Sequence, residues 1–240
     1  GPVCPSQGQP PPTTVPVVDT PPTAPGRRRV WSVAVVVGAV LLFAVMAVQI
    51  RYGNPAWDRS LFERFHDGPG DYAHPTGRLV RQVTRLGEVP AMALVTVTLA
   101  VWLAITRRPR AAVFAVVVPC VGAALANGLK TVFGQPRPDV RFHYVPLSTD
   151  SFPSGHTATA TVVWLTAALL LVRLLTTRVR YVLAGLCGTV PLLVGASRLY
   201  LGVHWPTDVI AGLSFGVAWV LGWYLVVFAI VPGRQPPGTA

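Results

Sequence analysis

Six long stretches of the chain are apolar around the whole circumference of a helix and almost free of charge. An apolar helix of about 20 residues crosses the hydrocarbon core of a bilayer, which is about 30 Å thick. A surface helix of a soluble domain would instead carry one apolar stripe and one polar face. The pattern therefore predicts an all-α fold, a polytopic membrane bundle of six transmembrane helices at about residues 30–50, 89–106, 111–129, 157–175, 181–200 and 208–231.

The two ends of the chain lack this pattern. Residues 1–26 are rich in Pro and Thr and nearly uncharged, so they cannot bury enough apolar surface to fold. We expect a disordered N-terminal tail over 1–26, one six-span domain over 27–231 and a short C-terminal tail over 232–240. Between the first two spans, the stretch WDRSLFERF (57–65) suits either a short helix in the membrane interface or an ordinary surface-covering loop.

Composition and charge support a membrane protein of defined orientation. The chain is 52% hydrophobic and only 12% charged, with a mean hydropathy of +0.51. Short basic connections cluster on one side of the predicted bundle, which the positive-inside rule assigns to the cytoplasm. They contain Arg27 to Arg29; Arg107, Arg108 and Arg110; Arg173, Arg178 and Arg180; and Arg234. We expect a multi-pass cell-membrane protein with both termini in the cytoplasm. The formal charge of +11 then reflects orientation and a local site, and does not indicate nucleic-acid binding.

Polar residues gather in three stretches at span ends, all on the predicted extracytoplasmic side. The stretches are KTVFGQPRP (130–138), SFPSGH (151–156) and SRLYLGVHWPTD (197–208). Ionisable groups at the depth of a membrane are costly and usually mark a functional site. Three cations, Lys130, Arg137 and Arg198, outnumber the nearby carboxylate. Because the fork of an Arg side chain and the point charge of Lys suit phosphate oxygens, we predict an anion site.

Two histidines and a carboxylate add catalytic chemistry to this site. His204 and Asp208 are four residues apart at the start of the last span, so the carboxylate can bind one ring nitrogen and leave the other free to attack. His156 could then protonate the departing oxygen. Ser154 and Gly155 precede a helix whose first N–H groups lack partners and can hold phosphate.

The three stretches resemble the signature motifs of the type 2 phosphatidic acid phosphatase (PAP2) superfamily. The matching patterns are K-x6-RP at Lys130, Arg137 and Pro138; PSGH from Pro153 to His156; and SR-x5-H-x3-D at Ser197, Arg198, His204 and Asp208. The resemblance implies a phosphatase that uses neither a metal nor another cofactor and forms a phosphohistidine on His204.

The resemblance also implies a role for each site residue. Asp208 orients the nucleophile and His156 is the acid for the leaving group. The phosphate is held by Lys130, Arg137, Arg198, Ser154 and Gly155. A metal cluster is not expected. Two histidines and one aspartate could supply three ligands, but the three cations beside them would repel a metal ion.

The expected substrate is a lipid phosphate, of the polyprenyl phosphate or diphosphate, phosphatidate or phosphatidylglycerophosphate class, with membrane lipids as the surrounding partners. Three alternatives stay open: a lipid phosphotransferase, a non-catalytic lipid-phosphate binding or transport protein, and a vanadate-dependent haloperoxidase, against which the six apolar spans count. Arg141, His143 and Asp150, in the loop between the first two motifs, could contact a headgroup, but a solvated loop is the favoured interpretation. The segment 51–88 and the oligomeric state receive no assignment.

Overall fold

A computed structural model describes residues 25–65, 74–143 and 149–230 of the 240-residue chain. The predicted tails, at 1–26 and 232–240, lie almost wholly outside these residues, and only Pro25 and Gly26 of the expected N-terminal tail are described, as the start of the first helix. Within the described ranges the chain is helical and contains no strand. The elements are α1 (Pro25–Arg51), α2 (Ala56–Phe65), α3 (Pro75–Arg85), α4 (Val89–Ile105), α5 (Pro109–Phe133), η1 (Val140–Phe142), α6 (Gly155–Leu174), α7 (Val179–Tyr200), α8 (Pro206–Tyr224) and the π-helical turn η2 (Leu225–Ile230).

Five of the described helices, α1, α5, α6, α7 and α8, are each long and apolar enough to cross a membrane. The 17 residues of α4 reach that length only together with α3, which meets α4 at an angle of 44°. The all-α membrane bundle is thus confirmed, with six spans if the bent pair α3–α4 counts as one. The apolar residues of α1 are mostly exposed, as expected of side chains that face lipid.

Segment 51–88 contains more helix than the sequence indicated. The predicted short helix over 57–65 is present as α2, whereas α3 was not predicted, because its many polar residues conceal it within a loop-like composition. His74 is the N-cap of α3 and accepts a hydrogen bond from the Thr76 N–H, and Pro75 occupies the first helical position, so both suit a helix start.

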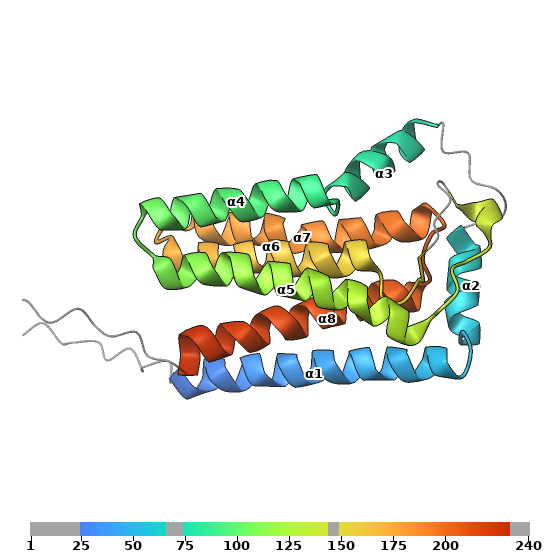
Figure 1. Ribbon diagram of the computed structural model, residues 1–240, viewed down its shortest axis with the longest axis horizontal. Coiled ribbons are helices and arrows are strands. Elements are labelled where there is room, and N and C mark those ends of the chain that lie inside the picture. The colour runs from blue at the N-terminus through green and yellow to red at the C-terminus, as the bar shows by residue number, and fades with distance from the viewer. Residues whose placement is uncertain (1–24, 66–73, 144–148, 231–240) are drawn as a thin grey trace, which may run out of the picture.

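The helix α6 lies in the middle of the bundle, between α5, α7 and α8, while α1 runs alongside α8 (Figure 1). Small residues allow α8 to approach α6 closely. A methyl group added at Gly212 would lie 2.9 Å from the Ser154 carbonyl oxygen, and one at Gly216 would lie 2.5 Å from Cβ of Thr161. This small-residue spacing on α8 is typical of membrane helix pairs. It places the beginning of α8 beside the beginning of α6.

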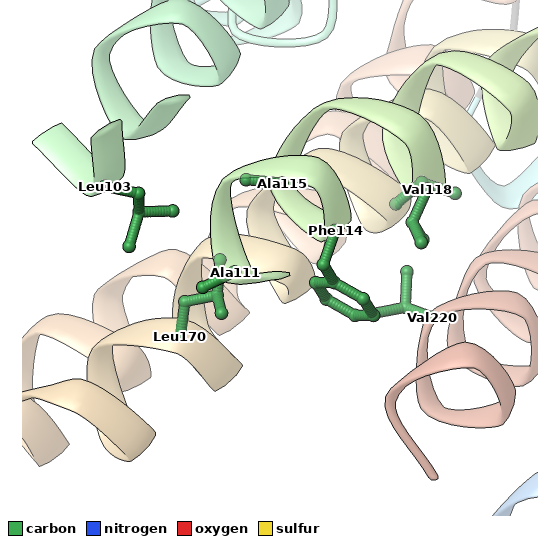
Figure 2. Packing of buried hydrophobic residues seen from close by; sticks show 8 residues of the cluster. Leu103, Ala111, Phe114, Ala115, Val118, Leu170 and Val220 are labelled. Atoms are coloured by element: carbon green, nitrogen blue, oxygen red, sulfur yellow. The ribbon is translucent and has the colours of Figure 1, made fainter. Parts of the chain in front are cut away.

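An apolar core fills the opposite end of the bundle. Figure 2 shows Phe114 of α5 pointing toward Val220 of α8, with Leu170 of α6 beside Ala111. Leu103 of α4 completes this cluster and is fully buried. Dispersion contacts hold α4, α5, α6 and α8 together at this end. The polar residues are at the other end of the bundle.

Candidate active site

The three polar stretches meet at one end of the bundle, where α5, α6 and α8 have their outer termini (Figure 1). They surround a cavity of about 430 Å³. Six of the eight predicted site residues line it: Lys130, Arg137, Gly155, His156, Arg198 and His204. The other two, Ser154 and Asp208, are fully buried behind this lining. The sequence prediction that these residues meet is therefore fulfilled in space.

His204 is held by the carboxylate that its spacing predicted. Its Nδ1 lies 3.1 Å from Oδ2 of Asp208, and the Ser151 hydroxyl lies 3.2 Å from the same nitrogen and donates to the same carboxylate oxygen. That oxygen also accepts from the backbone N–H of Trp205 at 2.8 Å, which closes the first turn of α8 as in a capping box. Asp208 thus orients the ring and caps the helix at once.

The second ring nitrogen of His204, Nε2, is on the side away from Asp208. A ring that donates from Nδ1 keeps its lone pair on Nε2, and there Nη1 of Arg137 approaches to 3.2 Å. Burial lowers the pKa of His204 well below its ordinary value, and the positive charges of Arg137, Arg198 and Lys130 act in the same direction. The imidazole is therefore neutral at pH 7 and has a nucleophilic lone pair.

Backbone carbonyl groups hold two of the cations in place. Nζ of Lys130 donates to the carbonyl groups of Asp150 and Ser151 at 2.9 and 3.4 Å. Arg137 donates from Nε to the Thr149 carbonyl at 2.7 Å and from Nη1 to the carbonyl of the residue before His204 at 2.6 Å. Lys130 lies in the last turn of α5, because this helix continues four residues beyond the predicted end of the third span. Carbonyl groups are neutral partners, so these hydrogen bonds leave the positive charges available to attract an anion.

The third cation, Arg198, comes from the last turn of α7. Its Nη1 donates to the hydroxyl of Thr84, at the end of α3, at 3.1 Å. Its Nε is buried and has no hydrogen-bond partner among the described residues. A buried guanidinium with an unused donor is costly. Arg198 also lines the cavity, where an anion could compensate its charge.

The beginning of α6 forms the floor of the cavity. A methyl group added at Gly155 would lie 3.1 Å from Oδ1 of Asn127 and 3.2 Å from Cε of Lys130, so a larger residue would push into the cationic wall. The half-buried His156 follows directly and lines the same cavity as His204. The free N–H groups of this first turn and the adjacent imidazole face the space that a phosphate would fill.

Some contacts of the site were not found by sequence reasoning. Ser151 stands just before the PSGH motif, and its position there is the only signal that could have indicated it. Thr84 and Thr149 have no motif around them. Asp150 contributes its carbonyl group as a hydrogen-bond acceptor, and its carboxylate acts on Lys130 and Arg137 through its charge. Arg141 is paired with Asp139 at 3.4 Å on the surface, as expected of a solvated loop. Nε2 of His143 donates to the Pro138 carbonyl, 2.9 Å away.

The helix α2 crosses this end of the bundle and anchors the loop that carries His204 (Figure 1). Asp58 is fully buried, and its carboxylate accepts from the backbone N–H and the hydroxyl of Thr207 at 2.8 and 2.9 Å. One turn later, the ring of Phe62 packs against that of Trp205, with ring centroids 5.1 Å apart and the planes tilted by 53°. Residues on both sides of Pro206 are therefore fixed from outside the motif.

No group of three or more His, Cys, Asp or Glu side chains in the described part of the chain is arranged to hold a metal ion. A second, apolar groove of about 520 Å³ lies between α5 and α8, near Phe114 and Trp219. It opens near the start of α5, whereas Lys130 is in the last turn of that helix, so the groove is remote from the site.

Comparisons with known proteins agree with this geometry. Lipid A 1-phosphatase of Rhizobium etli is 38% identical over 120 residues, which cover 46% of this chain and 45% of that protein. Phosphatidylglycerophosphatase B of Bacillus subtilis is 39% identical over 102 residues, covering 39% of this chain and 45% of that protein. The chain thus matches less than half the length of these curated relatives.

Two solved structures extend the similarity to most of the chain. The transmembrane PAP2-type phosphatidylglycerolphosphate phosphatase from Bacillus subtilis superposes with a TM-score of 0.71 at 26% identity, over 84% of this chain and 98% of that one. LpxE of Aquifex aeolicus superposes with a TM-score of 0.54 at 25% identity, over 70% of this chain and 94% of that one. The family model of the PAP2 superfamily matches residues 111–232, which include all eight predicted site residues. The chain belongs to the PAP2 superfamily.

Proposed function

We propose that the protein is a membrane lipid phosphatase that transfers phosphate from a lipid to His204 and then to water. The observation that carries this proposal is the His204 ring, held at Nδ1 by Asp208 and lining a cavity that is also lined by three cations. A site that only bound phosphate would have no use for an oriented nucleophile.

The reaction would proceed in two steps, transfer of the phosphoryl group to His204 and hydrolysis of the phosphohistidine. The Nε2 lone pair of His204 attacks phosphorus, the bond between phosphorus and the lipid oxygen breaks, and His156 gives its proton to that oxygen. Water then attacks the phosphohistidine while His156 takes a proton from it, the P–N bond breaks, and Nε2 recovers its lone pair. Phosphate leaves and the enzyme returns to its starting state.

The cations would supply most of the stabilisation. Phosphoryl transfer depends mainly on positioning and on charge neutralisation at the equatorial oxygens. In the structure Nη1 of Arg137 occupies the position in front of Nε2. When phosphate arrives, this donor would turn to a phosphate oxygen and release the lone pair for attack. Arg198, with its unused Nε, and Lys130 would bind the other oxygens.

The substrate would be a phosphate monoester or diphosphate of a lipid, of the polyprenyl, phosphatidate or phosphatidylglycerophosphate class. The relatives named above are phosphatases of lipid A and of phosphatidylglycerophosphate, and the site lies at the end of apolar helices, where a lipid headgroup would be within reach. The basic connection between α4 and α5 is at the opposite end of α5 from Lys130, so the positive-inside rule supports a site on the extracytoplasmic face and both termini in the cytoplasm.

The test is phosphate release by the purified protein in detergent, with EDTA present throughout. We expect release from at least one lipid phosphate by the wild type, no release by His204→Ala, and full release by the matched control His74→Ala, whose exposed ring lines neither cavity. Vanadate, which mimics five-coordinate phosphorus, should inhibit. Unimpaired release by His204→Ala would remove the nucleophile, and a strict divalent-metal requirement would contradict the mechanism.

Loss of phosphate from the lipid only when an acceptor alcohol is added, with formation of the phosphorylated alcohol in place of free phosphate, would support the phosphotransferase. Phosphate binding without turnover under any condition would support the binding or transport protein. The oriented His204–Asp208 pair favours the hydrolase over the latter, because binding alone does not require it.

A further inference from the structure

A second polar cavity, of about 340 Å³, lies beside the candidate active site. It is formed by one face of α3 and the turn that leads into α4, and it is lined by Arg78, Arg81, Gln82, Thr84, Arg85 and Glu88. The two cavities share Glu88. They are also joined through Thr84, whose hydroxyl accepts the hydrogen bond from Arg198.

The new cavity is cationic. Its arginines are spaced by three and four residues, so they project from one face of α3. Among the described residues that line the cavity, Glu88 has the only carboxylate. Nη1 of Arg85 donates to Oε1 of Gln82 at 3.0 Å, which holds that guanidinium along the cavity wall. Guanidinium groups arranged in this way are suited to phosphate or carboxylate oxygens.

We propose that this cavity binds a second anionic group of the lipid substrate while the phosphate to be removed occupies the His204 cavity. The inference rests on the proposed function and narrows its substrate class. Glu88 stands between the two cationic cavities, and its charge would repel an anion placed at the junction. The favoured substrate therefore carries two anionic groups separated by a neutral linker, and not the two adjacent phosphoryl groups of a diphosphate.

Three lipids with the same acyl chains test this assignment in detergent micelles: phosphatidic acid, diacylglycerol diphosphate and phosphatidylglycerophosphate. They present one anion, two adjacent anions and two separated anions. We expect the lowest KM for phosphatidylglycerophosphate. Arg78→Gln and Arg85→Gln should each raise that KM about tenfold, as expected for loss of one charge-assisted hydrogen bond, and change the KM for phosphatidic acid less than twofold. Arg64→Gln, an exposed arginine on α2 outside both cavities, is the matched control and should change neither value.

Two results would overturn the proposal. An equal rise of KM for all three lipids would mean that the arginines only attract anionic surfaces in general. An unchanged KM for phosphatidylglycerophosphate in both variants would mean that they do not contact the substrate.

Binding of the same lipids to His204→Ala, measured without turnover, separates this proposal from the proposed function. If His204→Ala binds phosphatidylglycerophosphate in preference to phosphatidic acid and loses this preference with Arg85→Gln, the second site is supported even where the wild type releases no phosphate. Turnover by the wild type without any such preference would retain the phosphatase and reject the second site.

Discussion

Asp58 offers a prediction that reaches the active site from outside every recognised motif. Its buried carboxylate accepts two hydrogen bonds from Thr207, the residue next to Asp208, and so ties α2 to the first turn of α8. Asp58→Ala removes both acceptors and leaves the N–H and the hydroxyl of Thr207 without partners in a buried place. Asp58→Asn keeps the shape, since its carbonyl oxygen can accept from the N–H and its amide can donate to the hydroxyl oxygen.

The two substitutions should differ strongly in magnitude. A buried polar group without a partner costs about 1–3 kcal/mol, so Asp58→Ala, with two such groups, should lower the free energy of unfolding by about 2–6 kcal/mol. Burial raises the pKa of Asp58 although the bonds from Thr207 act against this, which shows that its charge is itself costly to bury. Removing the charge while keeping the bonds, as Asp58→Asn does, should therefore change stability by less than about 1 kcal/mol.

The assay combines the melting temperature in detergent, followed by tryptophan fluorescence, with kcat measured well below that temperature. We expect Asp58→Ala to melt at least about 4 °C below the wild type and to lose about tenfold to a hundredfold in kcat, because the displaced Thr207 shifts Asp208 and with it the ring of His204. Asp58→Asn should resemble the wild type in both measurements. Equal damage from both variants would show that the charge and not the hydrogen bonding matters, and an undamaged Asp58→Ala would refute the reasoning altogether.

Three further predictions concern the site and its supports. Because burial and nearby cations lower the pKa of His204, the ring stays neutral and kcat/KM should be maintained as the pH falls below 6.5. Arg137→Gln removes one cation and raises that pKa, so the acidic limb of the pH profile should move to higher pH. An unmoved limb would contradict the assignment. Ser151→Ala removes a hydroxyl bound to the His204 ring and its carboxylate, and should lower kcat about tenfold with little change in KM, measured by phosphate release; a change in KM alone would argue for a binding role. Gly202→Ala should reduce the melting temperature, because the residue has a φ of +68° and its new methyl group would lie 2.2 Å from a carbonyl oxygen of η1. The cost should be about 1–3 kcal/mol or more. The control Gly185→Ala, whose methyl group would have nothing within 4 Å, should leave the melting temperature unchanged.

Much of the fold was predictable because the apolar spans are local features. The all-α bundle follows from runs of apolar residues long enough to cross a bilayer, which need no knowledge of packing. The helix α3 was missed because its arginines, interspersed with Val and Leu, do not form a local apolar run. Its contribution to a span appears only when α4 continues it across the 44° bend. The end of α5 was placed too early, because Lys130 is a charged residue that a hydropathy pattern assigns to a loop.

The sequence by itself indicated which eight residues come together at the proposed site, since they stand in short motifs at span ends and their charges and spacing already suit a phosphate and an oriented histidine. Only the tertiary structure decided how those residues are held. The bonds of Asp58 to Thr207 and of Arg198 to Thr84, and the approach of Arg137 to Nε2 of His204, join residues 149, 114 and 67 positions apart in the chain. Such contacts depend on how the helices pack, and packing is set by the fit of many side chains together, such as the close approach allowed by Gly212, which no local pattern records.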